Sequence, residues 1–389
     1  MITEETGTLL VLLIILFAGL VIPELFKKIR IPFVTSLIII GAVMGPYGLN
    51  YIETNQTIEF FGFLGMTFLM FMAGLDTNLK MIKELKYKVI LMSGLNIIIP
   101  FIFGLFIVKF FGYSWFVSFL IGVIFVSSSA IASVPFLEKS GLIKRNLGQI
   151  ILSSILIADI TSLVLLSFSL QEVSKVTILP LSLYFFIIFV SVFLMFFFIP
   201  KIFEHLVRKR FRSKTYHEKQ LRFVIVLVIS TLLFLSLLGA HPILAAFIIG
   251  MILSKVSVTE NILTKFHTLG YGLFVPVFFF ILGMKMDLSL FAKFGRGTAI
   301  ISSLCLGLII SKFGSGYLAG RLAKLSPRES SLFGSASIIH LTTTLAVVYI
   351  ASNLKLLDSV LISSIIFISI ITTFIGPIIL GTLLKEEMD

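Results

Sequence analysis

Asp159 is the residue of this sequence best suited to bind a cation or a proton. It lies near the middle of an apolar stretch, residues 146–170, that is long enough to cross a bilayer as one helix. A carboxylate at that depth costs at least about 2.5–3.5 kcal/mol on insertion scales, and such residues usually mark an ion or proton path. Desolvation disfavours the bare carboxylate, so we expect either a proton or a monovalent cation to bind at Asp159.

Three consecutive serines, Ser127, Ser128 and Ser129, interrupt the preceding apolar segment, and Pro135 follows them. Serine and proline at membrane depth predict an unwound or kinked helix that lines a cavity. Their hydroxyls, with freed backbone carbonyls, would complete an oxygen-rich cation site around Asp159. The alternative is that the serines only pack helices closely and that Asp159 is a satisfied structural acid.

Lys312 is the other deep charge, and it lies more than two turns from the nearest loop. A buried lysine needs a carboxylate or polar partner, and Asp159 is the deepest acid, so we expect the two side chains to pair. Snorkelling to the membrane interface is the alternative. Small neighbours would let another helix approach closely. These neighbours are Ser311, Gly314, Ser315 and Gly316.

A second broken helix is predicted at residues 334–349, a stretch that is polar where a span should be apolar. His340, Thr343 and Thr344 are its candidate site residues. The stretch contains no proline, so its break has a weaker signal than the first one. A hydrogen-bonded core histidine is the alternative reading of His340.

The composition indicates a polytopic helical membrane protein, because 58% of the residues are hydrophobic and 13% are charged. The net charge of +12 comes from basic residues between apolar spans, which favours the positive-inside rule over nucleic-acid binding. The one cysteine permits no disulfide within the chain and no cysteine metal site. Reversible ion binding needs no covalent step, so we expect neither an enzyme nor a cofactor.

We predict thirteen membrane spans. The acidic N-terminus lacks the basic region of a signal peptide, so the first span is expected to stay in place. The spans cover roughly 8–26, 33–49, 58–76, 88–110, 115–136, 146–170, 180–204, 221–239, 241–255, 269–287, 298–320, 330–352 and 357–383.

Basic residues gather in the loops after the first, third, fifth and seventh spans, which all lie on one side. The positive-inside rule therefore places the N-terminus outside and the C-terminus in the cytoplasm of a cell membrane. A docking patch for acidic lipid or a partner is the alternative reading of the longest basic loop. The loops contain Lys27, Lys28, Arg30, Lys80, Lys83, Lys86, Lys139, Lys144, Arg145, Arg208, Lys209, Arg210, Arg212 and Lys214.

An internal repeat appears at an offset of 209 residues, which relates Gly41 to Gly250, Gly74 to Gly283 and Ser128 to Ser337. Seven predicted spans separate each pair, and an odd shift reverses direction through the membrane. Inverted repeats are typical of secondary transporters. We expect one transmembrane domain over residues 1–389, with repeats at about 8–170 and 221–383 and a linker span at about 180–204.

Two motifs of the sequence are FLMFMAGLDTNL at 68–79 and SSSAIAS at 127–133. They resemble the acidic "F-x-x-G-L" segment and the unwound stretch of the monovalent cation/proton antiporter superfamily. Within that superfamily the sequence resembles in particular the branch of Kef-type potassium efflux systems and Nap-type sodium/proton antiporters. The resemblance covers nearly the whole chain. Its other segments are 31–49, 141–159, 241–254, 274–288 and 311–320.

The resemblance implies an all-α sodium/proton antiporter-like fold with two crossing broken helices, a mobile core, membrane lipid around it and a homodimeric state. The family's essential carboxylate falls on Asp159 and its core basic residue on Lys312. The implied activity is exchange of Na⁺ or K⁺ for H⁺. A channel, a non-transporting sensor or assembly subunit, and a carrier of organic anions are alternatives.

The sequence departs from the family at Ala158, where members often have a second polar or acidic residue before the essential aspartate. A single acid favours electroneutral exchange. The last predicted span ends close to Asp389, so no cytoplasmic nucleotide-binding domain is expected within this sequence.

Overall fold

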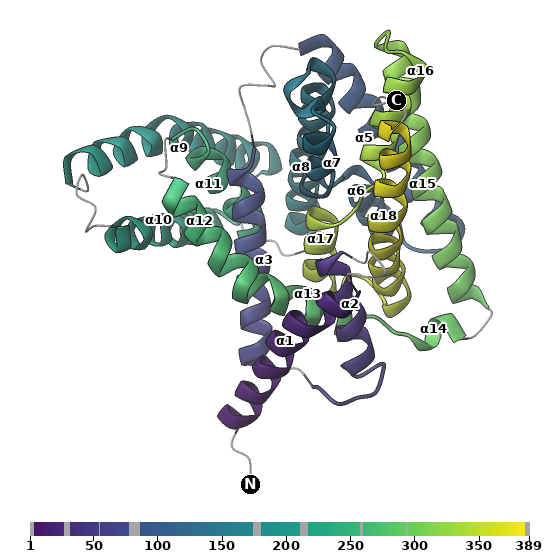
Figure 1. Ribbon diagram of the computed structural model, residues 1–389, viewed down its shortest axis with the longest axis horizontal. Coiled ribbons are helices and arrows are strands. Elements are labelled where there is room, and N and C mark those ends of the chain that lie inside the picture. Colours follow the sequence, from purple (N-terminus) through teal and green to yellow (C-terminus); the bar gives the residue numbers. More distant parts are fainter. Residues whose placement is uncertain are drawn as a thin grey trace. The chain divides into compact units, whose positions relative to one another are not determined.

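The computed structural model describes residues 4–26, 32–53, 55–77, 86–173, 180–210, 217–256, 260–292 and 295–385. Within these residues every regular element is a helix (Figure 1). The chain divides into two compact units. Unit 1 consists of Met1–Gly62, Lys80–Leu166 and Pro276–Asp389, and unit 2 consists of Phe63–Leu79 and Ser167–Val275. These units cut across the repeats expected at 8–170 and 221–383, whose bounds stay a prediction.

Unit 1 contains the predicted ion site. Its helix α15 packs against α5, α16 and α18, and α5 packs against α6. Figure 1 shows α15, α16 and α18 side by side. The helices of this unit are α1 (Glu4–Phe26), α2 (Phe33–Met44), α5 (Lys86–Phe110), α6 (Trp115–Val126), α7 (Ala130–Lys139), η2 (Leu142–Lys144), most of α8 (Asn146–Val173), α13 (Val275–Met284), α14 (Ser289–Ala292), α15 (Arg296–Leu322), α16 (Pro327–Ser337), α17 (Thr342–Asn353) and α18 (Ser359–Lys385).

Unit 2 contains most of α3 (Gln56–Leu75) and a group of later helices in which α11 packs against α9 and α10. Its helix α12 continues into a one-turn π-helix, η4, before α13 begins. The later helices are α9 (Leu181–Arg210), α10 (His217–Leu237), α11 (Pro242–Leu253), α12 (Glu260–Leu269) and η4 (Gly270–Phe274).

Each of the thirteen predicted spans falls on a helix or a helix pair in the described part of the chain. Ten helical segments there are long and apolar enough to cross a membrane, and the three shorter apolar helices are Phe33–Met44, Trp115–Val126 and Pro242–Leu253. Many of the basic loop residues used to orient the chain, including Lys27, Lys80 and Lys214, lie outside the described residues.

The two broken helices are present. The first is α6 and α7, which are separated at Ser127–Ser129, where Ser127 and Ser129 have extended backbone angles. The break is thus at the serines, and Pro135 lies inside α7. Serine hydroxyls compete for backbone groups and favour such interruptions. The second is α16 and α17, which are separated at residues 338–341 without any proline.

Four glycines related by the repeat let helices meet backbone to backbone. In unit 1, a Cβ at Gly41 of α2 would lie 2.0 Å from the Phe280 carbonyl oxygen of α13. In unit 2, a Cβ at Gly250 of α11 would lie 2.2 Å from the Phe71 carbonyl oxygen of α3. A Cβ at Gly283 would lie 2.1 Å from the Ile38 carbonyl oxygen, and a Cβ at Gly74 would lie 2.2 Å from the Phe247 carbonyl oxygen. The offset of 209 residues therefore relates the two contacts in one unit to the two in the other.

Gly41→Ala should destabilise the protein, because the added methyl group has no space beside Phe280. Overpacking of this kind typically costs about 1–3 kcal/mol. Gly94→Ala is the control, since nothing lies within 4 Å of a Cβ at this position in α5. It should be neutral or gain up to about 1 kcal/mol of helix propensity. Thermal unfolding of the purified protein in detergent measures both, and equal midpoints for the two variants would contradict the packing described.

Candidate ion-binding site

The broken helices cross and hydrogen-bond to each other at their breaks. The Ser129 N–H donates to the Ile339 carbonyl oxygen (2.7 Å), and the Ser128 hydroxyl donates to the Ser337 carbonyl oxygen (2.9 Å). A helix end leaves backbone donors or acceptors without partners inside the helix, and in the membrane interior water is not there to satisfy them. Each broken helix therefore supplies part of what the other lacks.

Two helix ends at the crossing carry opposite partial charges, and the ionisable side chains match them. The Lys312 ammonium donates to the carbonyl oxygen of Val126, the last residue of α6, at 2.6 Å. The Asp159 carboxylate Oδ1 accepts from the Ser128 N–H, just before α7 begins, at 3.1 Å. A cation at a helix C-terminus and an anion near an N-terminus are both favourable. The breaks thus help to hold both charges inside the membrane.

Asp159 comes from the middle of α8 and is 5% exposed. Besides its bond from Ser128, it interacts electrostatically with Thr343 at the start of α17 and with Lys312. The structure therefore brings the predicted carboxylate, the first break and the second broken helix to one place. One carboxylate beside hydroxyls suits a monovalent cation, and the described residues contain no group of three or more His, Cys, Asp or Glu side chains that could hold a metal ion.

Lys312 is completely buried and has four oxygen acceptors within hydrogen-bond distance. These are the Asn96 carbonyl (3.3 Å), the Asn96 Oδ1 (3.2 Å), the Val126 carbonyl (2.6 Å) and the Ser128 hydroxyl (3.0 Å). None of the four is the Asp159 carboxylate. Ser128 lies between the two charges, since its hydroxyl accepts from Lys312 and its backbone N–H donates to Asp159. In place of the direct pair expected from the sequence, the two charges are connected through Ser128.

The remaining candidate residues also meet at the crossing. The Ser127 and Thr344 hydroxyls are 2.6 Å apart, and the Thr344 hydroxyl is 2.9 Å from His340 Nδ1. The sequence did not identify the Thr372 hydroxyl of α18, which accepts a hydrogen bond from the backbone N–H of His340. Two buried atoms near the breaks, Ser129 Oγ and His340 Nε2, have no hydrogen-bond partner among the described residues.

These atoms matter because a buried polar group without a partner costs about 1–3 kcal/mol. Such groups are kept where a ligand or water satisfies them. The Thr343 hydroxyl interacts with the Asp159 carboxylate. A carboxylate beside a hydroxyl has the oxygen chemistry that suits a proton or a desolvated monovalent cation.

Asn96 on α5 is a second site residue that sequence reasoning missed. Its side chain is buried and hydrogen-bonds to Lys312, Ser315 and Ser337. An amide within an otherwise apolar helix, four residues before Pro100, was the available signal. The small residues around Lys312 act as expected in part, because a Cβ on Gly316 would meet Gly334 of α16 at 2.7 Å whereas Gly314 has open space.

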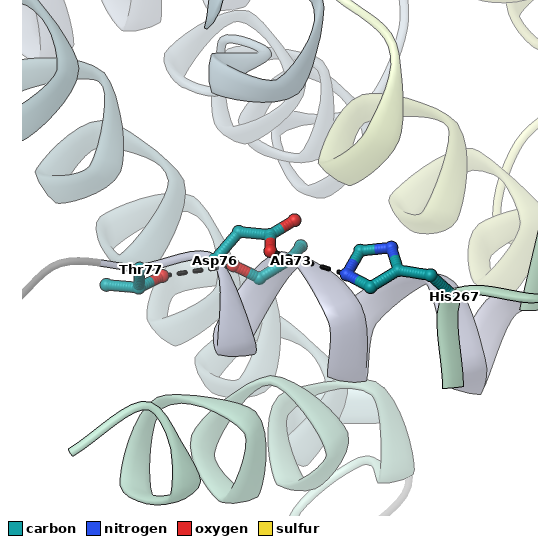
Figure 2. A network of polar contacts seen from close by, with 4 residues as sticks. All are labelled: Ala73, Asp76, Thr77 and His267. Carbon is teal, nitrogen blue, oxygen red and sulfur yellow. Dashed lines mark hydrogen bonds and ion pairs between the residues drawn. The ribbon is translucent and has the colours of Figure 1, made fainter. Parts of the chain in front are cut away.

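Other polar contacts lie away from the crossing. In unit 2, His267 Nε2 lies 3.7 Å from Asp76 Oδ1, and the Thr77 hydroxyl donates to the Ala73 carbonyl oxygen (Figure 2). In unit 1, the Lys285 ammonium donates to Asn353 Oδ1 at 2.8 Å. Asp76 and Lys285 thus form their contacts near helix ends and away from the crossing.

Paired broken helices with ionisable groups at their crossing define this protein as a secondary transporter of the antiporter-like class. The chain matches the family "Sodium/hydrogen exchanger, transmembrane" over residues 12–386. Because the match covers nearly the whole chain, the protein belongs to this family. Membership confirms the superfamily expected from the sequence, and it makes the protein a transporter and not an enzyme.

Two relatives match along their full length. The chain is 28% identical to "Probable Na(+)/H(+) antiporter 3" of Methanocaldococcus jannaschii, with 95% of each chain covered. It is 26% identical to "Na(+)/H(+) antiporter" of Enterococcus hirae, with 97% of this chain and 98% of the relative covered. Both names are those of sodium/proton antiporters, so the Kef-type part of the expected branch gains no support from them.

The fold is similar to that of the sodium proton antiporter MjNhaP1 from Methanocaldococcus jannaschii, whose structure was determined at pH 8. The TM-score is 0.73 at 17% sequence identity, and 99% of each chain is covered. This similarity confirms the predicted antiporter-like fold of inverted repeats and crossing broken helices.

Lys312→Ala should destabilise the protein strongly, because four oxygen acceptors and a buried acid lose their cation. Leaving a buried charge uncompensated typically costs about 3–5 kcal/mol. Adding Asp159→Asn should recover part of the lost thermal stability, since the remaining buried charge is then removed. Lys285→Ala is the control, because it removes a lysine that is only half-buried, and it should cost less stability. Strictly additive losses from the two site substitutions would show that Lys312 and Asp159 do not interact.

Proposed function

We propose that this protein exchanges a monovalent cation, Na⁺ or K⁺, for H⁺ by alternating access. The observation that carries the proposal is the Asp159 carboxylate, buried where two broken helices cross and in contact with Ser128 and Thr343. A proton and a cation would compete for this one carboxylate. The printed names of both full-length relatives support sodium and protons as the exchanged ions.

Each site residue has a distinct role in this proposal. Asp159 binds the proton or the cation, and oxygens of Ser127, Ser128, Ser129 and Thr343 complete the cation's coordination. Lys312 stabilises the ionised carboxylate through Ser128 while neither ion is bound. The core that contains the crossing then carries the loaded site from one side of the membrane to the other.

A channel and a non-transporting sensor or assembly subunit on the same fold are less well supported. A channel requires a continuous pore, whereas the side chains at this crossing are almost completely buried. A sensor would not need a carboxylate at a cost of several kcal/mol in the membrane interior. Family membership favours the exchanger as well.

The proposal extends to the setting of the protein. The distribution of basic loops supports a multi-pass protein of the cell membrane with its N-terminus outside and its C-terminus in the cytoplasm. The resemblance to the antiporter superfamily supports a homodimer. Accessibility of single engineered cysteines at the two termini to a membrane-impermeant reagent tests the orientation.

Asp159→Asn should abolish cation-driven proton movement, because a neutral amide binds neither ion while keeping the shape of the side chain. The measurement is cation-dependent dequenching of a pH dye in proteoliposomes, with Na⁺ and K⁺ tested in turn. Asp287→Asn removes a carboxylate that bonds only locally to Ser289, so it serves as the control and should retain exchange. Near wild-type exchange by Asp159→Asn would refute the ion-site assignment.

Exchange should be electroneutral, one proton for one cation, because Ala158 replaces the second acid found in electrogenic members of the superfamily. A single carboxylate carries the same net charge with either ion bound. The membrane potential, worth about 2.3 kcal/mol per charge per 100 mV, then cannot drive the cycle. A potential imposed with potassium and valinomycin should leave the equilibrium sodium gradient equal to the pH gradient. A voltage-dependent shift of that gradient would refute one-for-one exchange and would point to a further proton-releasing group, for which Lys312 and His340 are the candidates.

A further inference from the structure

The Asn96 side chain connects Lys312 to the second broken helix. It is 2% exposed on α5, and its amide nitrogen lies within hydrogen-bond distance of the Lys312 carbonyl (3.2 Å), the Ser315 hydroxyl (3.0 Å) and the Ser337 hydroxyl (3.2 Å). Its amide oxygen accepts from the Lys312 ammonium at 3.2 Å. One side chain thus contacts both the buried cation and the last residue of α16.

The backbone of Asn96 is also a ligand of Lys312, and the sequence explains why. In a regular helix the Asn96 carbonyl would accept the N–H of the residue four positions later, which here is Pro100. Proline has no N–H, so this carbonyl loses its helical partner. The Lys312 ammonium donates to it at 3.3 Å. Asn96 and Pro100 together therefore create two acceptors at one position of a membrane helix.

The number of N–H donors on Lys312, compared with the number of its acceptors, shows that the lysine does not need Asp159 as a partner. An ammonium group has three N–H donors, and Lys312 has four acceptors, two of them from Asn96. The lysine is therefore fully hydrogen-bonded without the carboxylate of Asp159. Lys312, Ser128, Ser337 and Asn96 also form a closed ring, since Ser128 donates to the Ser337 carbonyl and Asn96 donates to the Ser337 hydroxyl.

We propose that Asn96 is a positioning residue that holds the Lys312 ammonium away from Asp159 and thereby leaves the carboxylate to the transported cation. This inference rests on the proposed exchange function. Without its side chain, Asn96 keeps only its backbone carbonyl, so Lys312 is left with three neutral acceptors, and the anionic group that could replace the lost one is Asp159, on the far side of Ser128. Hydrogen bonds between charged groups are stronger than those to neutral groups. A direct Lys312–Asp159 pair would then compete with the cation.

The test is the apparent KM for Na⁺, measured at fixed pH by dye dequenching in proteoliposomes. If the wild-type protein prefers K⁺, the same measurement uses K⁺. Asn96→Ala should raise this KM about tenfold, the factor expected for one charge-assisted hydrogen bond, with little change in maximal rate. Asn96→Asp should keep KM within about threefold of wild type, because the new carboxylate gives Lys312 an acceptor of its own.

The control is Ser93→Ala, three residues earlier on α5. Ser93 is also buried, but its hydroxyl donates only to the Val89 and Ile90 carbonyls of its own helix. Its KM should equal that of the wild type. A role of Asn96 in folding alone would lower the yield and maximal rate of Asn96→Ala and leave its KM unchanged, and this outcome would overturn the proposal. A raised KM in Asn96→Asp would also overturn it.

Two further variants test the route through Lys312. Pro100→Ala supplies an N–H that competes for the Asn96 carbonyl, so it should raise KM about threefold even if Asn96→Ala does not fold. In a Lys312→Ala background, Asn96→Ala should change KM no further, because the contact no longer exists. An additional rise in that background contradicts the proposal. Absence of exchange by the wild-type protein with every cation would refute the proposed function itself.

Discussion

The structure depends on the exchange of hydrogen bonds between its two helix breaks. Unwound backbone in the membrane interior exposes N–H and C=O groups that have no water to bind, at a cost of several kcal/mol for each unsatisfied group. The first break alone would be costly, and so would the second. Together they pair Ser129 with Ile339 and Ser128 with Ser337, and Lys312 satisfies the open end of α6. The proposed ion site lies where this pairing occurs.

Most of the fold could be predicted because its signals lie along the chain. Apolar length gives the spans, serine clusters give the breaks, and a carboxylate in the middle of a span gives Asp159. Even the second break, without a proline, could be found from the repeat and from the polar run that contains His340 and Thr344. All these properties depend on how deep a residue lies in the membrane, and the position of the residue along its predicted span gives that depth.

What the sequence could not provide is the direction in which a side chain points around its helix axis. Asn96 lies at the right depth, but only the packing of α5 against α15 shows that it faces Lys312. For the same reason a direct pair between Lys312 and Asp159 was expected, although Ser128 lies between them. Two deep opposite charges suggest attraction, while the acceptors that Lys312 actually uses come from α5, from the end of α6 and from the first break.

The buried carboxylate and the Ser129 hydroxyl at the crossing have a consequence for leakage. In the proposed exchange, the return step with neither ion bound carries a bare carboxylate through the membrane, and the Ser129 hydroxyl has no hydrogen-bond partner among the described residues. The bare charge costs at least about 2.5–3.5 kcal/mol on insertion scales, and the hydroxyl without a partner costs about 1–3 kcal/mol. A bound proton removes the first cost, and a bound cation that the hydroxyl coordinates removes both. The same groups that bind the ions would thus slow the futile half-cycle that dissipates an ion gradient.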